Sequence, residues 1–215
     1  MSKERRIPAF FRLHGCFSKF DTRCFVGRVT GIENWREMNS DDIKLRFLQL
    51  LTRQYYEVVP KKYRTFCVFN ARLLQIVLSH YFIHSELMPC QIWLSRADDS
   101  IALGFLDTTP GPGGWDGHVA CRSGDFFIDA SVYHFNEASS VAMPDAVLVQ
   151  RFNRPSHVLG RHNISDSDRL WWHQPPDGVD PTPPQENQAD LDLYAGQLVR
   201  HLDAMLANSR KLVHS

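Results

Sequence analysis

A histidine and an aspartate at the open end of a predicted β-hairpin have the residue types of a general base and its orienting carboxylate. The hairpin consists of two short apolar runs, His118–Cys121 and Phe126–Asp129, separated by the turn residues Arg-Ser-Gly-Asp. A carboxylate that accepts a hydrogen bond from one imidazole nitrogen fixes the tautomer and leaves the other nitrogen as a base. The chemistry therefore depends on whether His118 and Asp129 meet.

The position of the turn determines which residues face each other. Placing Ser123 and Gly124 at its tip predicts three opposed pairs: Cys121 with Phe126, Val119 with Ile128, and His118 with Asp129. Directly opposed residues share a face of the sheet, with Cβ atoms about 4.5–5.5 Å apart. The same alternation puts apolar residues on both faces, so we expect the sheet to be covered on both sides.

Cys67 is the candidate nucleophile for this pair, because it opens a strongly apolar helix predicted to run to about Phe82. A helix without a polar face is enclosed by the fold. Its first turn would direct unpaired N–H groups and the positive end of the helix dipole at Cys67, which favours a thiolate and can bind an oxyanion. The alternatives are a structural role for this thiol, or a nucleophile at Cys90 or Cys121. We expect Cys90 at the start of a strand and Cys121 on the face opposite His118.

This order of residues resembles the papain-like/transglutaminase-like cysteine superfamily, which includes transglutaminases, arylamine N-acetyltransferases and many uncharacterised bacterial proteins. The resemblance covers about residues 63–132: a Cys opening an apolar helix, then Gly-His-Val on one strand and Phe-Ile-Asp-Ala on the next. Phe66 stands where the family usually has Gly or Trp. The resemblance implies an α+β fold, with a buried central helix packed on an antiparallel sheet. It also implies a Cys67-His118-Asp129 triad that acts without a cofactor on a peptide, amide or ester.

Composition is that of a globular protein with a sizeable core: 215 residues, 43% apolar, 22% charged, and a formal net charge of zero. The sequence has no polybasic run, so it does not suggest nucleic acid or a membrane surface as a partner. No apolar run reaches the length of a signal peptide or membrane span. Five irregularly spaced cysteines favour reduced thiols and a cytoplasmic setting, and Cys16 and Cys24 are too far apart for a zinc knuckle.

We expect one domain over residues 1–215, with a catalytic-like core at about 39–152. Asn39 or Ser40 would cap an amphipathic helix that ends before Pro60. Further strands are predicted at Gln91–Leu94, Ile101–Phe105 and Ala146–Gln150.

The C-terminal third has a polar segment, a Pro-rich segment and a predicted helix. Residues 153–187 are polar and then Pro-rich, and we interpret about 174–187 as a strap or linker. A terminal helix over Ala189–Ala207 would either dock on the domain or form a contact between copies of the chain.

The predicted function is acyl transfer or hydrolysis through Cys67, with His118 as base and then acid and Asp129 as its orienter. The alternative is an inactive scaffold that binds proteins through a stacking surface at Trp171–Trp172 and through the terminal helix, although a core contact is the commoner role for such a tryptophan pair. His80 and His84 have the spacing of two helical metal ligands, but Tyr81 stands where a metalloprotease motif has Glu, so we expect no metal. The Gly-rich loop at about 107–114 is either the border of a substrate cleft or a plain surface connection.

Overall fold

The computed structural model describes residues 40–106, 115–153 and 156–213, and it shows an α+β fold with an antiparallel sheet. Cys16, Cys24 and the Gly-rich loop lie outside the described residues. The helices are α2 (Ser40–Val58), the short 3-10 helix η2 (Lys61–Tyr63), α3 (Cys67–His80), α4 (His134–Ala138) and α5 (Gln188–Val213). The strands are β1 (Glu86–Ser95), β2 (Ser100–Leu103), β3 (His118–Ser123), β4 (Phe126–Asp129), β5 (Val147–Gln150), β6 (Val158–Asn163) and β7 (Arg169–His173).

The seven strands form a sheet that nearly closes on itself. Their order is β5-β4-β3-β1-β7-β6, with β2 paired to β1, and every pairing of neighbours is antiparallel. The two outer strands of this path meet where Arg151 bridges to Gly160 and the Phe152 N–H donates to the Leu159 carbonyl at 2.8 Å. The sheet therefore has an inner face and an outer face.

Both faces of the sheet are covered, as the hairpin pattern predicted. On β3, Val119 and Cys121 belong to a core shared with the helices, whereas Ala120 belongs to a second core that fills the inside of the sheet. Buried residues of β1, β5 and β7 complete the inner core. His118 alternates with Val119 along β3 and thus lies on the inner face.

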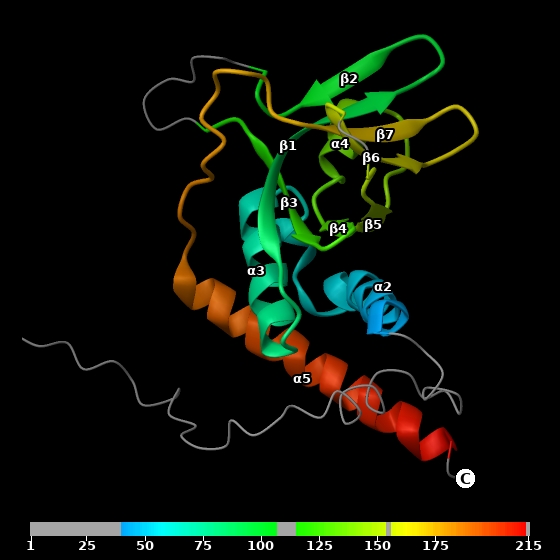
Figure 1. Cartoon of the computed structure of the whole chain (residues 1–215), viewed down its shortest axis with the longest axis vertical. Coiled ribbons are helices and arrows are strands. Elements are labelled where there is room, and N and C mark those ends of the chain that lie inside the picture. The colour runs from blue at the N-terminus through cyan, green and yellow to red at the C-terminus, as the bar shows by residue number, and fades with distance from the viewer. Residues whose placement is uncertain (1–39, 107–114, 154–155, 214–215) are drawn as a thin grey trace, which may run out of the picture.

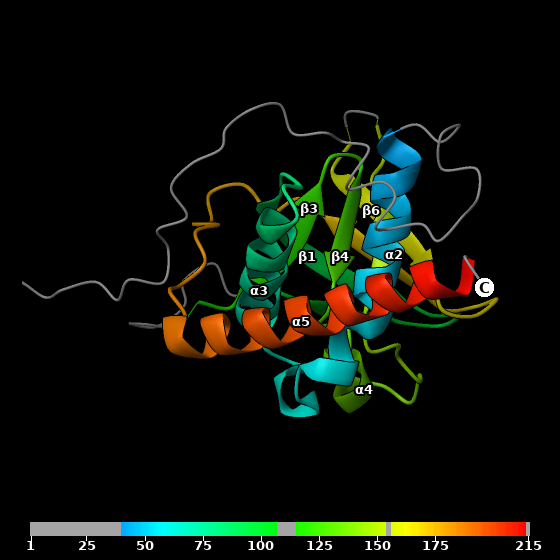
Figure 2. The same cartoon turned by 90° about the horizontal axis from the view of Figure 1, so that it is seen from below.

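α2 and α3 cover the outer face of the sheet (Figures 1 and 2). α3 packs against β3, and α5 crosses both α3 and α2. The contact face of α5 consists of Leu191, Ala195, Leu198, Leu202 and Leu206. The terminal helix thus docks on the fold, the first of the two alternatives, and it is longer than the predicted Ala189–Ala207.

α2 and α3 follow the sequence patterns closely. α2 carries Asp41 and Asp42 in its first turn, where carboxylates favour the positive end of the helix. α3 begins at Cys67 and is buried over most of its surface, as predicted. It ends at His80 rather than Phe82, because Phe82 has a left-handed φ of 59°. His80 and His84 are both exposed, and His84 lies beyond the helix.

The predicted strands Gln91–Leu94 and Ile101–Phe105 were wrong in extent, and two further strands were not predicted. Residues 153–187 contain β6 and β7, although Gly, Arg, His and Asn in β6 hide its periodicity. β1 begins at Glu86 rather than Gln91, with Pro89 inside it. Pro89 is tolerated because β7 joins β1 only from Gln91 onward, so the side of β1 opposite β3 is unpaired at that point. β2 ends at Leu103, short of the predicted Phe105.

Within the described residues, none of the helices combines the length and the apolar character that are needed to cross a lipid bilayer.

Candidate active site

Cys67 is the first residue of α3, and its half-buried thiol lies near the start of β3. The Sγ–H donates to the Gly117 carbonyl oxygen at 3.8 Å. Phe66 precedes it with non-helical dihedrals (φ −96°, ψ 76°) and gives the helix no side-chain cap. The first N–H groups of α3 therefore have no capping side chain beside the sulfur, which is the arrangement in which a helix end attracts an anion.

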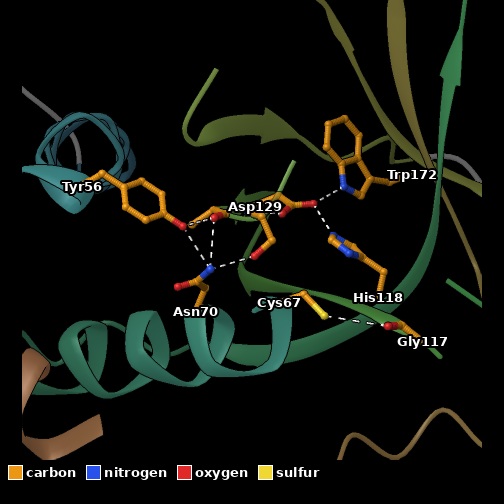
Figure 3. A network of polar contacts seen from close by, with 9 residues as sticks. Tyr56, Cys67, Asn70, Gly117, His118, Asp129 and Trp172 are labelled. Carbon is orange, nitrogen blue, oxygen red and sulfur yellow. Dashed lines mark hydrogen bonds and ion pairs between the residues drawn. The ribbon is translucent and has the colours of Figure 1, made fainter. Parts of the chain in front are cut away.

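His118 and Asp129 are hydrogen-bonded, as predicted, and both side chains are buried. His118 Nε2 lies 2.7 Å from Asp129 Oδ2, and the two side chains are 3% and 0% exposed. Because Nε2 is taken by Asp129, Nδ1 is the ring nitrogen left to interact with Cys67. Figure 3 shows the imidazole between the Asp129 carboxylate and the Cys67 sulfur.

The predicted register of the hairpin was wrong. The observed pairs are Cys121 with Ile128, Arg122 with Phe127, and Ser123 with Phe126, so the two-residue loop is Gly124-Asp125 instead of Ser123-Gly124. Gly124 has φ +62°, as the first loop position of a type II′ turn requires. Continuing this register puts Asp129 opposite Ala120, so His118 and Asp129 meet as diagonal neighbours.

The Asp129 carboxylate accepts three hydrogen bonds. Oδ2 accepts from His118 Nε2 and from the indole N–H of Trp172, each at 2.7 Å. Oδ1 accepts from the backbone N–H of Ser131 at 2.9 Å. Trp172 comes from β7 and is fully buried. Sequence reasoning took Trp172 for a core contact or a stacking surface and missed its bond to Asp129, because its position depends on an unpredicted strand.

The pKa values of the pair move in opposite directions. Burial alone lowers the pKa of His118, but the charge and hydrogen bond of Asp129, assisted by Cys67, outweigh it and raise the value to about 10. Burial alone raises the pKa of Asp129, but the charge of His118 and the hydrogen bonds from His118, Trp172 and Ser131 lower it overall. At neutral pH the pair is therefore an imidazolium and a carboxylate.

Asn70 is a second polar centre next to the site, and sequence reasoning missed it. It lies one turn after Cys67 and is 1% exposed. Its Nδ2 is within hydrogen-bond distance of Ala130 O (3.1 Å), Ser131 Oγ (2.9 Å), Tyr63 O (2.8 Å) and Tyr56 Oη (3.1 Å), while its Oδ1 accepts from Tyr55 at 2.9 Å. Tyr56 also donates to the Ala130 carbonyl. An amide flanked by apolar residues in the first turns of this helix was the available signal, because buried amides need partners.

Asn70 connects α3 with the segment that holds Asp129. Ser131 accepts from Asn70 through its hydroxyl and donates to Asp129 through its backbone N–H. The helix that carries Cys67 is thereby bonded to the chain that carries the orienting carboxylate (Figure 3).

The other two described cysteines are poor nucleophiles. Cys121 lies on the helix-facing side of β3, away from His118 as predicted, and burial raises its pKa to about 12. Cys90 is opposite His118 on β1, inside the strand rather than at its start, and burial raises its pKa well above the ordinary value. Both are therefore neutral thiols at physiological pH.

No metal site accompanies these groups in the part of the chain that the structure describes, where no three His, Cys, Asp or Glu side chains gather as metal ligands would. A cavity of about 720 Å³ is lined by residues 96–99, 140–142, 164, 165, 167 and 168. None of the candidate site residues lines it. Among its charged groups, Arg96 binds Asp99 at 3.5 Å and Asp168 accepts from Ser165 at 2.7 Å.

Comparison with known proteins adds no further evidence: no protein-family model, no curated protein and no solved structure matches this chain.

Proposed function

We propose that this protein is a cysteine-dependent acyltransferase or hydrolase of papain-like/transglutaminase-like type, acting on an amide, ester or peptide bond. The observation that supports it best is the position of the buried His118 between the Asp129 carboxylate, 2.7 Å away, and the thiol of Cys67. A raised imidazole pKa beside a sulfur at a helix N-terminus favours a thiolate–imidazolium pair.

The reaction proceeds in two halves. The Cys67 thiolate attacks the substrate carbonyl carbon, forming a C–S bond while the carbonyl electron pair moves to the oxygen. The uncapped N–H groups at the start of α3, that of Cys67 first, stabilise this oxyanion. The intermediate collapses to a thioester and expels an amine or alcohol, which takes its proton from His118.

In the second half, neutral His118 takes a proton from water or from an acceptor amine or alcohol. That acceptor attacks the thioester carbonyl, and sulfur leaves as the thiolate. Asp129 keeps its charge throughout and holds Nε2, so that Nδ1 is the nitrogen that exchanges protons. Water as the acceptor gives hydrolysis, and an amine or alcohol gives transfer.

The deciding experiment is the pH–rate profile of Cys67 alkylation by iodoacetamide, resolved by peptide mass spectrometry. In the native protein we expect labelling to stay fast at mildly acidic pH, because the imidazolium stabilises the thiolate. In His118→Ala the rate should rise only toward alkaline pH, as for an ordinary thiol. Asp129→Ala should have nearly the same effect, because without the carboxylate the buried His118 is neutral and the charge beside the sulfur is lost.

Cys90 and Cys121 are internal controls, since both are buried and should stay unlabelled in the folded protein. Superimposable profiles for the native protein and His118→Ala would overturn the proposal. The remaining candidate would then be the inactive, protein-binding scaffold.

A further inference from the structure

We propose that the outer face of strands β2, β1, β7 and β6 is a protein-binding surface, and that its partner is the Pro-rich, acidic segment 174–187 of a second copy of this chain. The tryptophan pair of β7 then has two roles. Trp172 faces inward and binds Asp129, whereas Trp171 faces outward. The inference goes beyond the proposed function and does not depend on it, because none of the candidate site residues lies on this face.

The register of the sheet places two tryptophans side by side on the outer face. Trp171 pairs with Arg161 of β6 on one side and with Trp93 of β1 on the other, and directly opposed residues share a face. Both indoles are half-buried, and neither belongs to the two hydrophobic cores. The strands on which α2 and α3 pack are β1, β3, β4 and β5. The pair therefore lies beside the helix layer instead of beneath it.

Both indoles are held in place by their neighbours. The N–H of Trp93 donates to Gln91 Oε1 at 2.8 Å, and Gln91 Nε2 donates to the Gly104 carbonyl at 3.1 Å. The Arg161 guanidinium lies 5.5 Å from the centre of the Trp171 ring. A surface that is ordered before binding loses less conformational entropy on association. Tryptophan and arginine are also the residues most enriched in the energetic centres of protein interfaces.

This face is positively charged. Its other side chains are polar, small or basic: Gln91, Ser95, Ser100, Ala102, Asn163, Arg169 and His173. None of them is Asp or Glu, although the chain has 24 acidic and 24 basic residues. Arg161 and Arg169 are both exposed. The face therefore favours a partner that combines carboxylates with rigid apolar groups.

Segment 174–187 has the complementary chemistry. It contains five prolines and three carboxylates, Asp177, Asp180 and Glu186, but no Lys, Arg or His, and it forms neither helix nor strand. Residues before proline favour an extended backbone, which biases the stretch 180–184 toward polyproline II. With three residues per turn, Pro181 and Pro184 share one edge, and both are exposed. Proline-rich segments of this kind dock on surfaces lined with aromatic rings.

The segment is directed away from the tryptophans of its own copy. Arg72 on α3 donates to the Pro184 carbonyl at 3.1 Å, and the segment continues into α5, which docks on α3 and α2. Figure 1 shows it descending from the end of β7 to α5 on the α3 side of the molecule. Asp177 and Asp180 remain exposed. The segment of one copy can therefore meet the tryptophan face of another.

The test is charge reversal followed by sedimentation velocity between about 1 and 100 μM protein, the range of modest protein interfaces. We expect the native chain to self-associate as its concentration rises. Arg161→Glu/Arg169→Glu reverses the face, and Asp177→Lys/Asp180→Lys reverses the segment. Each variant alone should associate about tenfold more weakly or not at all. An equimolar mixture of the two should associate again, because each face then meets a segment of opposite charge.

Arg200→Glu is the matched control, since Arg200 is exposed on α5, outside the face, and its reversal should leave association unchanged. All four reversed residues are exposed, so the unfolding free energies of the variants should stay close to that of the native chain. A native chain that remains monomeric would overturn the inference. So would self-association that survives either reversal, or a mixture of the two reversed variants that stays monomeric. None of these results bears on Cys67 alkylation, which tests the proposed function separately.

Discussion

Trp172 and His118 donate to the same oxygen of Asp129, each over 2.7 Å. The two donors come from strands β7 and β3, which are not neighbours in the sheet but have β1 between them. The carboxylate is thus fixed from two directions inside the sheet, and its remaining oxygen is bound by Ser131. Four predictions concern this carboxylate, its ion pair with His118 and the residues that hold the pair in place.

Trp172→Phe should destabilise the protein by about 3 kcal/mol, through a lost hydrogen bond to a charged group and a cavity in the inner core. Loss of a donor also raises the folded-state pKa of Asp129, so acid unfolding should begin at a higher pH. Urea unfolding at neutral and acidic pH measures both effects. Trp171→Phe, on the opposite face of the same strand, should leave the pH at which acid unfolding begins unchanged. If acid unfolding of Trp172→Phe began at the same pH as in the native protein, the indole N–H would not be lowering the pKa of Asp129.

Stability should also depend on pH through the His118–Asp129 pair. The pKa of His118 rises on folding from 6.5 to about 10, so its stabilising contribution is fully present below about pH 6.5 and is lost as pH rises through about 10. The pKa of Asp129 falls on folding from 3.8, so its contribution is present above that value and is lost as pH falls through the folded pKa.

The measurement is the difference in unfolding free energy between the native protein and the double variant His118→Asn/Asp129→Asn across pH. Tyrosines whose raised pKa values do not depend on this pair, such as Tyr81, are present in both proteins and cancel in the difference. The difference should be greatest between about pH 4 and 6.5 and should decrease toward alkaline pH. A difference that is flat with pH would exclude a buried ion pair.

Gly104→Ala should damage the site more than its distance from it in sequence suggests. Gly104 has φ +81°, and a Cβ there would lie 2.7 Å from the backbone nitrogen of His118 and 3.3 Å from the Cys90 carbonyl. We expect Gly104→Ala to lower the free energy of unfolding by about 2 kcal/mol more than Gly178→Ala does. It should also slow Cys67 alkylation, because it displaces His118. Gly178 is the matched control, because it has φ +82° and nothing within 4 Å of its Cβ position. Equal effects of the two variants would show that backbone strain alone is responsible.

Asn70→Asp should be strongly destabilising at neutral pH, although the two side chains have nearly the same shape. The substitution replaces a donor with a charged oxygen that faces the carbonyls of Tyr63 and Ala130. Burial would raise the pKa of the new carboxyl, so the loss should be about 3 kcal/mol or more at neutral pH and should shrink as pH falls and the group is protonated. Gln75→Glu, on the same helix with one 3.2 Å bond to the Ser85 carbonyl, should change stability by less than about 1 kcal/mol. A pH-independent loss in Asn70→Asp would contradict this account of the network.

The hairpin shows which part of the candidate site could be predicted from the sequence. The turn lies one residue from its predicted place, which changes the pairing by two residues. Because side chains alternate with a period of two, this error preserves the face of every residue, and His118 and Asp129 still meet. The sequence Arg-Ser-Gly-Asp permits both turns, and the choice depends on the backbone conformation of Gly124.

Patterns with strong periodicity were predictable, and contacts across the sheet were not. α2 and α3 follow from their apolar spacing and from Pro60, which ends the first of them. β6 was missed because Gly160, Arg161 and His162 mask the alternation, and the shift in register at Val158/Gly160 interrupts it further. Without β6 and β7 the closure of the sheet cannot be predicted, so the bond between Trp172 and Asp129 could not be predicted either.

The link between α3 and the end of β4 has a consequence for the motions of the molecule. Asn70 ties the helix to Ala130 and Ser131, so the first turn of α3 cannot separate from this chain unless several buried hydrogen bonds break together. The amide hydrogens of Asn70, which bonds to the Phe66 carbonyl, and of Ser131, which bonds to Asp129, therefore belong to one cooperative opening unit, with protection close to that of global unfolding. The distance between the Cys67 sulfur and the His118 imidazole is therefore kept by a part of the protein that opens last.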